Sequence, residues 1–176
     1  MFRITILSTI VAAIILTLTL SPVGRSATEP EARLRVGVYD SRAIAVAYAA
    51  SDFNPVDEKM KQYEAAMAAG DESKVEKLEQ WGERSQRRLH RQGFGRVPVT
   101  DLLAHVQDRF PEIAEQTDVD VIAFECNYLA RDVEEVDITM ALVSLYDPSP
   151  KTLKTAREVM KHEPISLEEI ERHHEH

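Results

Sequence analysis

The sequence predicts an α+β fold, in which a small β-sheet body is interrupted by a helical hairpin arm and followed by extra C-terminal helices. Apolar and polar residues alternate over residues 34–39 and 119–125, which is the period-two pattern of a strand. A third, shorter strand is expected at 128–133. Between the first two, residues 55–93 repeat apolar side chains at intervals of three and four, which is typical of helices. Strands so far apart in sequence predict one sheet with an inserted arm.

Composition fits one domain with a targeting segment. The chain has 176 residues, a formal net charge of −9 and a single cysteine, Cys126. A chain of this length buries a core without disulfides, and one cysteine cannot form an intrachain disulfide. We expect Cys126 to be a buried structural thiol rather than a reactive one. The acidic balance argues against general nucleic-acid binding.

The N-terminus has the pattern of a secretory signal. Arg3 precedes an apolar run at residues 4–20, and a helix breaker with small residues follows at 21–26. We therefore expect residues 1–26 to be a signal peptide, cleaved before Ala27, and the mature protein to be exported to the periplasm or cell envelope. The apolar run is also near the shortest length that spans a bilayer, so an uncleaved N-terminal anchor is the alternative.

The first strand leads directly into a helix. Leu34, Val36 and Val38 share one face of this strand. Asp40 follows as a helix cap, and apolar residues continue at helical spacing until Pro55 ends the run. This predicts a strand–helix unit at the front of the body.

The arm is predicted to be two antiparallel helices. The first helix carries a narrow apolar seam of four residues, Val56, Met60, Tyr63 and Met67. Gly70 stops this helix, and a similar seam follows in the second helix, at Val75, Leu78, Gly82, Ser85 and Leu89. If the chain reverses at Gly70, Tyr63 lies near Leu78 and Met60 lies near Trp81. Such short helices need support at the base of the arm.

Further helices are predicted on either side of the second strand. One starts at Val99 or Thr100 and reaches about Gln116, with Pro111 kinking or restarting it. Another starts after Asp137, which is a good cap. The helix that contains Ile44 and the helix that contains Leu102 are expected to pack on one face of the second strand, and its other face is expected to meet neighbouring subunits.

The second strand is expected to form a hairpin. Residues 119–125 are mostly apolar on both faces, which predicts cover on both sides of the strand. Asn127 is a turn residue, and residues 128–133 then return as the shorter strand. Residues 147–176 form a C-terminal helical extension, in which Ser149 and Ser166 are expected to cap two short helices.

Two short segments resemble the Skp/OmpH-like family of periplasmic chaperones. The front segment is VGVYDS at residues 36–41, and the back segment combines VDVIA at 119–123 with Tyr128 and DIT at 137–139. The resemblance covers about residues 34–146. It implies three chains that assemble their strands into a small barrel and whose arms hold unfolded outer-membrane proteins without chemistry or ATP.

The chain also departs from this family. Its arm is much shorter than the family's tentacles and carries no net charge, whereas the family's arms are basic. The last two helices have no counterpart in the family. The resemblance implies an exported, oligomeric holdase chaperone or envelope assembly factor. The oligomer that it implies is a homotrimer. The alternative is a non-catalytic structural or interaction module of the cell envelope on the same fold.

Two sets of candidate residues follow. The expected oligomer interface consists of Val36, Val38, Ile122, Phe124 and Tyr128. The expected client-binding set consists of Arg84, Arg87, Arg88, Arg91, Phe94 and Arg96. Arginine offers fork-like contacts to phosphates, so these residues suit anionic lipid, lipopolysaccharide or acidic client segments. A solvated face that pairs with acidic residues of a neighbouring chain is the alternative that we favour.

Other chemistry has weak support. The sequence contains no common nucleophile, phosphate-binding or zinc-protease motif, so we expect no enzyme, cofactor or metal. Asp101 and His105 are one helical turn apart and suit a surface pair better than a catalytic dyad. Residues that suggest zinc or nickel are concentrated at the C-terminus, where we favour a solvated tail: His162, His173, His174, Glu175 and His176.

Several large apolar residues have two interpretations. They are Met60, Tyr63, Met67, Trp81 and Met140. Methionine and aromatic side chains make adaptable surfaces for clients. At seam spacing they also suit core packing, which is the interpretation that we favour.

Overall fold

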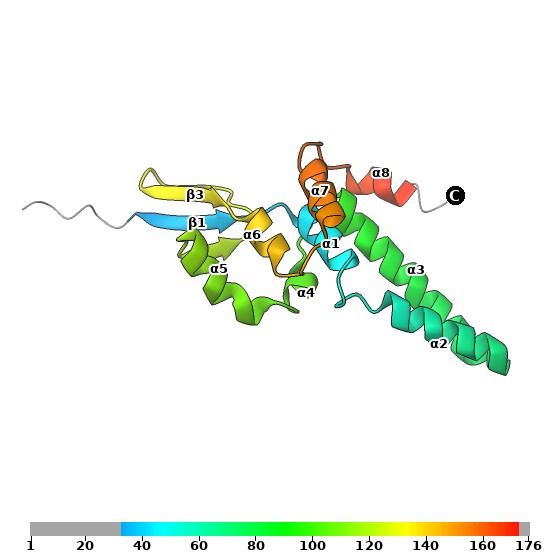
Figure 1. The fold of residues 1–176 in the computed structure, drawn as a ribbon. Helices are drawn as coiled ribbons and strands as arrows, with labels where there is room; N and C mark the ends of the chain where they lie inside the picture. The colour runs from blue at the N-terminus through cyan, green and yellow to red at the C-terminus, as the bar shows by residue number, and fades with distance from the viewer. Residues whose placement is uncertain (1–32, 173–176) are drawn as a thin grey trace, which may run out of the picture. The chain divides into compact units, whose positions relative to one another are not determined.

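The computed structural model describes residues 33–172 and confirms the α+β fold class (Figure 1). The strands are β1 (Leu34–Val38), β2 (Val121–Ala123) and β3 (Val133–Asp137). The helices are α1 (Ser41–Ala49), α2 (Val56–Ala69), α3 (Glu72–Phe94), α4 (Thr100–Leu103), α5 (Phe110–Thr117), α6 (Thr139–Ser144), α7 (Pro150–Val159) and α8 (Leu167–Arg172), with a 3₁₀ turn at Gln107–Arg109. The predicted signal segment lies outside the described residues. None of the described helices is both long and apolar enough to cross a membrane.

The three strands are all parallel, in the order β2-β1-β3. The predicted hairpin is therefore wrong: residues 128–132 are not a strand, and the third strand starts at Val133. Strand β1 is central and pairs with both later strands, so the chain must cross back over the length of the sheet between them. Residues 124–132 make this crossover. A contact between the rings of Tyr39 and Phe124 holds one end of it, and Arg33 donates to the carbonyl of Arg131 at the other.

The sheet has one covered face and a second, largely exposed face, which we call the uncovered face although Val36 at its centre is buried. On the covered face Gly37 leaves room for Ile138, since a Cβ at Gly37 would lie 2.7 Å from the end of that side chain. Ile122, which pairs with Gly37 in register, packs against the core on this face. The opposite face carries Leu34 and Val121, which remain 46% and 44% exposed. The prediction that the second strand is covered on both sides is therefore wrong for a single chain.

The main core lies between the covered face of the sheet and helices α1, α6 and α7. Helix α1 is almost entirely apolar and buried, and Ile44 has no exposed surface. Leu142 of α6 and Ala156 of α7 are equally buried. Burying a side chain such as Ile44 stabilises a fold by about 1.5–3 kcal/mol. Helix α1 is thus the element on which the others assemble.

The segment after the arm is more broken than predicted. One helix was expected, but α4, the 3₁₀ turn and α5 follow one another instead. Proline has no N–H and its ring clashes with the carbonyl one turn earlier, so a new helix, α5, starts at Phe110 with Pro111 in its first turn. Leu102, Leu103 and Val106 form the buried side of this segment. The break lets both Val106 and Ile113 reach the core.

A buried ion pair fixes the start of α1. The Asp40 carboxylate accepts from the backbone of Arg42 at 2.9 Å and from its guanidinium at 2.6 and 3.0 Å. Arg42 also donates to the carbonyl of His162, 2.8 Å away, beyond the end of α7. Burial raises the pKa of the Asp40 carboxyl, but the hydrogen bonds and charge of Arg42 outweigh this and lower its pKa overall. The predicted cap at Asp40 thereby also anchors α7.

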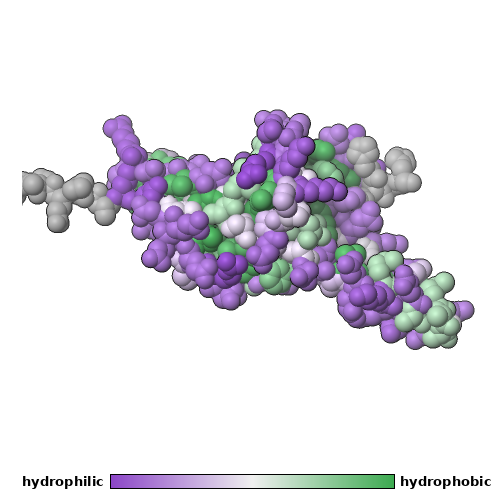
Figure 2. Space-filling model, viewed as in Figure 1, coloured by the Kyte–Doolittle hydropathy of each residue, from purple (hydrophilic) through white to green (hydrophobic). Residues whose placement is uncertain are grey.

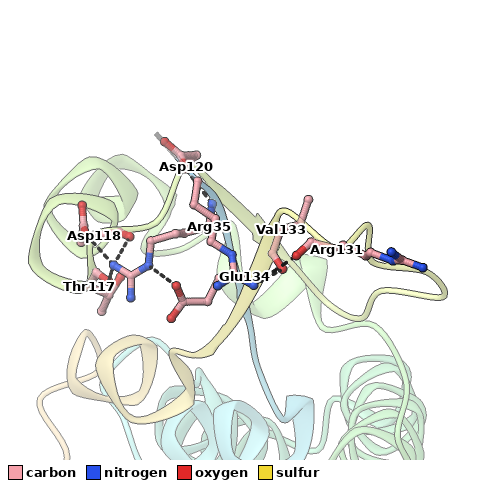
Figure 3. A network of polar contacts seen from close by, with 8 residues as sticks. Arg35, Thr117, Asp118, Asp120, Arg131, Val133 and Glu134 are labelled. Atoms are coloured by element: carbon pink, nitrogen blue, oxygen red, sulfur yellow. Dashed lines mark hydrogen bonds and ion pairs between the residues drawn. The ribbon is translucent and has the colours of Figure 1, made fainter. Parts of the chain in front are cut away.

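A second polar network joins β1 to α5 and β3 (Figure 3). The Arg35 guanidinium forms an ion pair with Asp118 and donates to the Asp118 carbonyl at 2.6 Å, at the C-terminal end of α5. It also lies 3.6 Å from the carboxylate of Glu134 on β3. The Arg35 backbone exchanges two hydrogen bonds of 2.8 Å with Asp120. A cation at a helix C-terminus is favourable, so Arg35 stabilises α5 where it meets the sheet.

The arm is the predicted helical hairpin. Helix α2 ends at Gly70, which adopts the left-handed conformation (φ 68°), and Asp71 caps α3 by accepting from the Lys74 backbone at 3.0 Å. The Tyr63 hydroxyl donates to Glu79 across the two helices at 3.0 Å. The apolar seam is open, however, because Met60 and Met67 remain 51% and 57% exposed. Figure 2 shows apolar surface at the distal end of the arm.

The two C-terminal helices pack on the body and on the base of the arm. Ser149 and Ser166 cap α7 and α8 as predicted, by accepting from Thr152 and Glu169. Helix α7 packs along α1, and α8 packs on the end of α3. The Ile165 backbone also donates to the Phe94 carbonyl at 2.9 Å. These helices therefore give the arm the support at its base that its length requires.

Candidate binding groove

A large apolar groove lies where the arm meets the body. We call it the arm groove, and its volume is about 870 Å³. Four helices line it. The lining residues are Ala45, Val46 and Ala49 of α1; Asn54, Val56, Lys59, Met60 and Tyr63 on the α2 side; Leu78, Glu79, Trp81, Gly82, Ser85, Gln86, Leu89, His90, Gly93 and Phe94 of α3; and Thr155 and Val159 of α7. Apolar side chains reach the surface between α7 and the base of the arm (Figure 2). Met60, Tyr63, Leu78 and Trp81, which were predicted to face one another in pairs, all line this groove.

Several polar side chains of the arm groove have partners within the chain. The Lys59 ammonium lies 5.8 Å from the centre of the Trp81 ring, within the range of a cation–π contact. The hydrogen bond to Glu79 raises the pKa of the Tyr63 hydroxyl, because the carboxylate favours its protonated form. The His90 and Phe94 rings meet edge to face at 5.5 Å. The rest of the lining is mainly apolar, so the arm groove suits an apolar ligand.

Two glycines of α3 open the floor of the arm groove. Among the described residues, nothing lies within 4 Å of a Cβ placed at Gly82 or Gly93. Glycine inside a helix destabilises it by about 0.5–1 kcal/mol relative to alanine. No contact within the described chain requires these glycines. They leave space in the groove that a larger side chain would fill.

The outer side of α3 is basic. Arg84, Arg87, Arg88 and Arg91 come together there, and with Gln92, Val97 and Pro98 they line a hollow of about 370 Å³ that we call the arginine face. Arg88 pairs with Asp101 at 3.4 Å. The other two predicted client-binding residues lie elsewhere. Phe94 lines the arm groove, and the Arg96 guanidinium lies 5.9 Å from the centre of the Phe124 ring.

The predicted interface residues fall on both sides of the sheet. Val36 and Val38 alternate with Gly37 and therefore lie on the opposite face of the sheet, where Val36 is buried and Val38 is half-buried. Ile122 and Phe124 instead pack against the core of their own chain. Tyr128, in the crossover, is 84% exposed. Leu34 and Val121 were not predicted as interface residues, although they are exposed on the same face as Val36.

Residues considered for chemistry or metal binding have other partners. Asp101 accepts from Gln92 at 2.7 Å, and the His105 ring lies between those of Tyr48 and Phe53. His162, just beyond α7, lies 3.6 Å from the carboxylate of Glu158. Within residues 33–172, no cluster of three or more His, Cys, Asp or Glu is placed to hold a metal ion. The other four tail residues considered for metal binding lie outside the described part of the chain.

Two further expectations concern single side chains. Cys126 is half-buried in the crossover, so it is less enclosed than predicted. Met140 packs against the core, as we favoured, while Met60 and Met67 form the exposed apolar surface that was the alternative. The sequence did not reveal that α1 and α7 form walls of the arm groove. The glycines within α3 were the one signal of open space there.

Comparisons with protein-family models, with curated proteins and with solved structures found no match. The fold and the arm groove therefore define the class of protein by themselves. It is an α+β body with a helical arm and an apolar groove at the base of that arm.

Proposed function

We propose that this protein is an exported, Skp/OmpH-like holdase that binds apolar segments of unfolded or membrane-bound client proteins in its arm groove. The observation that carries the proposal is the groove itself: about 870 Å³ of mainly apolar surface that the chain leaves open. Exposed apolar patches of this kind mark binding sites in soluble domains. Met60, Phe94 and Val56 on its margin are all more than 40% exposed.

The meeting of the two motif segments supports the resemblance to the family. Asp40 in the front segment donates its backbone N–H to the Thr139 hydroxyl in the back segment. The Ile138 backbone donates to the Val38 carbonyl at 2.9 Å. The segments quoted for the resemblance thus form one structural unit, and the arm is inserted between them.

The proposal includes a homo-oligomer, with a trimer as the first candidate. The uncovered sheet face carries the exposed Leu34 and Val121, and Tyr128 in the crossover is exposed as well. Strands β2 and β3 both have a free edge within the described residues. Apolar side chains beside unpaired edges favour association with another copy.

The test is suppression of aggregation. An unfolded outer-membrane protein is diluted from urea into buffer with the mature protein, and light scattering is followed. We expect scattering to fall as the holdase is added, and the Met60→Glu variant to protect less because it places a charge in the arm groove. No protection at several-fold excess contradicts the proposal. Light scattering after size exclusion tests the oligomer separately.

The arginine face supports an additional contact with anionic groups, as lipopolysaccharide or anionic lipid would present. Four arginines around one hollow supply a strong positive field on the side of α3 away from the arm groove. Flotation with vesicles of phosphatidylglycerol tests this contact, with phosphatidylcholine vesicles as the control. Binding that disappears in the double variant Arg87→Glu, Arg88→Glu supports it, and equal binding to both vesicles contradicts it.

A second candidate is a non-catalytic interaction module that holds one folded partner. The integration of α7 into the wall of the arm groove favours it, because it makes the groove a single defined site. The aggregation assay separates the two candidates. A module of this kind binds its partner through the groove but gives no protection to unfolded chains.

A further inference from the structure

The walls of the arm groove have few backbone groups to offer a ligand, and those lie near helix ends, at Ala49, Val56 and Gly93. Its lining comes almost wholly from α1, α2, α3 and α7. Within a helix, N–H and C=O groups already bond to each other. An extended segment that entered the groove would place its own N–H and C=O groups against apolar side chains without partners. Such unpaired groups oppose binding strongly.

We infer that the arm groove binds an amphipathic α-helix of the client, and not an extended strand. A helix brings its backbone hydrogen bonds with it and presents a stripe of apolar side chains to the groove. This inference rests on the proposed function and names the client element that the groove accepts. A client segment without structure in solution folds into this helix as it binds.

The two glycines of α3 fit such an occupant. Gly82 and Gly93 lie eleven positions apart, which is about three helical turns, so they are on the same face of α3. Both line the groove, with Ser85 between them. Small residues on one helix face allow a second helix to approach closely, with its larger side chains in the spaces. The open space at both glycines therefore suits the ridge of a docked helix.

The charged residues of the arm groove determine which side chains a docked helix should carry beside its apolar stripe. The exposed Glu79 and the half-buried Lys59 are acidic and basic members of the lining. Their charges cancel, so the floor favours an uncharged stripe. A complementary helix has a narrow apolar stripe, with a basic side chain on its edge to meet Glu79 and an acidic one to meet Lys59.

Trp81 provides a direct measure of binding. It is the one tryptophan in the sequence and it lines the arm groove, so its emission reports occupancy. The probes are synthetic peptides of about 18 residues without tryptophan, long enough for a helix to form on binding. The first has a leucine stripe at helical spacing between Lys and Glu. The second is the same peptide with a central proline, and the third has the same composition in strict alternation.

We expect the helical peptide to shift Trp81 emission and to bind about a hundredfold more tightly than the proline peptide, because proline breaks the helix. The alternating peptide should bind as weakly as the proline peptide. Gly82→Leu should abolish binding of the helical peptide without lowering the melting temperature, since it fills open space and removes a helix glycine. Gln80→Leu adds the same side chain at an exposed position outside the groove lining and should leave binding unchanged.

The outcomes separate this inference from the proposed function. Equal or tighter binding of the alternating peptide overturns the helix inference but leaves a client-binding groove. If no peptide shifts Trp81 emission and unfolded clients are not protected, both proposals fail. A shift that depends on protein concentration alone, with no response to peptides, shows that the groove is occupied by a second copy and overturns the inference.

Discussion

The backbone N–H of Asp40 donates a hydrogen bond to the hydroxyl of Thr139, 2.9 Å away, and so joins residues 99 positions apart in the chain. Thr139 is buried at the start of α6, and its backbone N–H donates to the Asp137 carboxylate at 2.8 Å. The contact therefore ties the end of β1 to the start of α6. It lies where the two motif segments meet.

Replacing Thr139 should destabilise this junction. Thr139→Val keeps the shape but removes the acceptor, so the Asp40 N–H loses its partner in a partly buried place. We expect a loss of about 1–3 kcal/mol in the free energy of unfolding, measured by urea denaturation. Thr139→Ser retains the hydroxyl and should recover much of the loss. Equal stability of the valine and serine variants would show that the hydrogen bond contributes nothing.

Breaking the ion pair of Asp40 and Arg42 should lower the free energy of unfolding by more than Thr139→Val does. Their side chains are 17% and 5% exposed, so Asp40→Asn leaves a buried guanidinium without its counter-charge. We expect a loss of about 3 kcal/mol at neutral pH by urea denaturation. Asp52→Asn, in an exposed loop, is the matched control and should change stability little. A loss no larger than that of the control would contradict this role of the pair.

The same pair predicts a dependence on pH. The folded-state pKa of Asp40 lies below its ordinary value, so its contribution is complete above about pH 3.9, the ordinary pKa of Asp in an unfolded chain. It is lost as the pH falls through the lower folded-state pKa. Urea midpoints measured from pH 2 to 7 should therefore fall less steeply at the acid end for Asp40→Asn than for the natural protein. Parallel curves would argue against this assignment.

Tyr146 should stabilise the fold through a single buried hydrogen bond. Its hydroxyl donates to the Leu102 carbonyl at 3.0 Å and links α4 to the end of α6. Tyr146→Phe should cost about 1 kcal/mol, measured by thermal or urea unfolding. Tyr128→Phe changes a hydroxyl on a ring that is 84% exposed and serves as the control. Burial raises the pKa of Tyr146, so its contribution is present below about pH 10 and is lost as pH rises toward the folded-state pKa.

The two faces of the sheet should respond differently to charge. Val121→Lys places a charge on the uncovered face, and we expect it to lower the molecular mass measured by light scattering while the monomer stays folded. Phe124→Asp instead disrupts contacts with Tyr39 and the core, so it should lower stability by about 2–3 kcal/mol. A natural protein that is strictly monomeric would remove the proposed interface. Dissociation by Phe124→Asp at unchanged stability would show that the oligomer interface includes Phe124 and not the uncovered face.

Local signals predicted local structure well. Gly70 and Asp71 specify the reversal of the arm, and Ser149 and Ser166 specify helix starts, because each acts on backbone groups within a few residues. The position of β3 could not be predicted in this way. Which strands pair with β1 depends on a balance of contacts across the whole chain, and residues 128–133 do not reveal that balance by themselves. The hairpin was therefore a reasonable but wrong interpretation.

The arm groove could not be predicted from the sequence, for a related reason. Val46 and Val159 line it from α1 and α7, and the residues of these helices alone suggest ordinary core positions. Their convergence with the open seam of the arm depends on how α7 packs along α1. The arginines of α3 were found because charge on one face of a single helix is visible in the sequence. Whether they act in binding stays a prediction.

In the all-parallel sheet, β1 pairs only with strands that lie far along the chain. Arg35 of β1 bonds to Asp120, 85 positions later, and the pairing of β3 requires the chain as far as Asp137. The arm closes through contacts that are near in sequence, so its helices can form while the chain is still being made. Strand β1 is synthesised early, and both of its edges stay unpaired until β2 and β3 have been synthesised. During that interval the chain that we propose as a holdase exposes a β-strand of its own to aggregation.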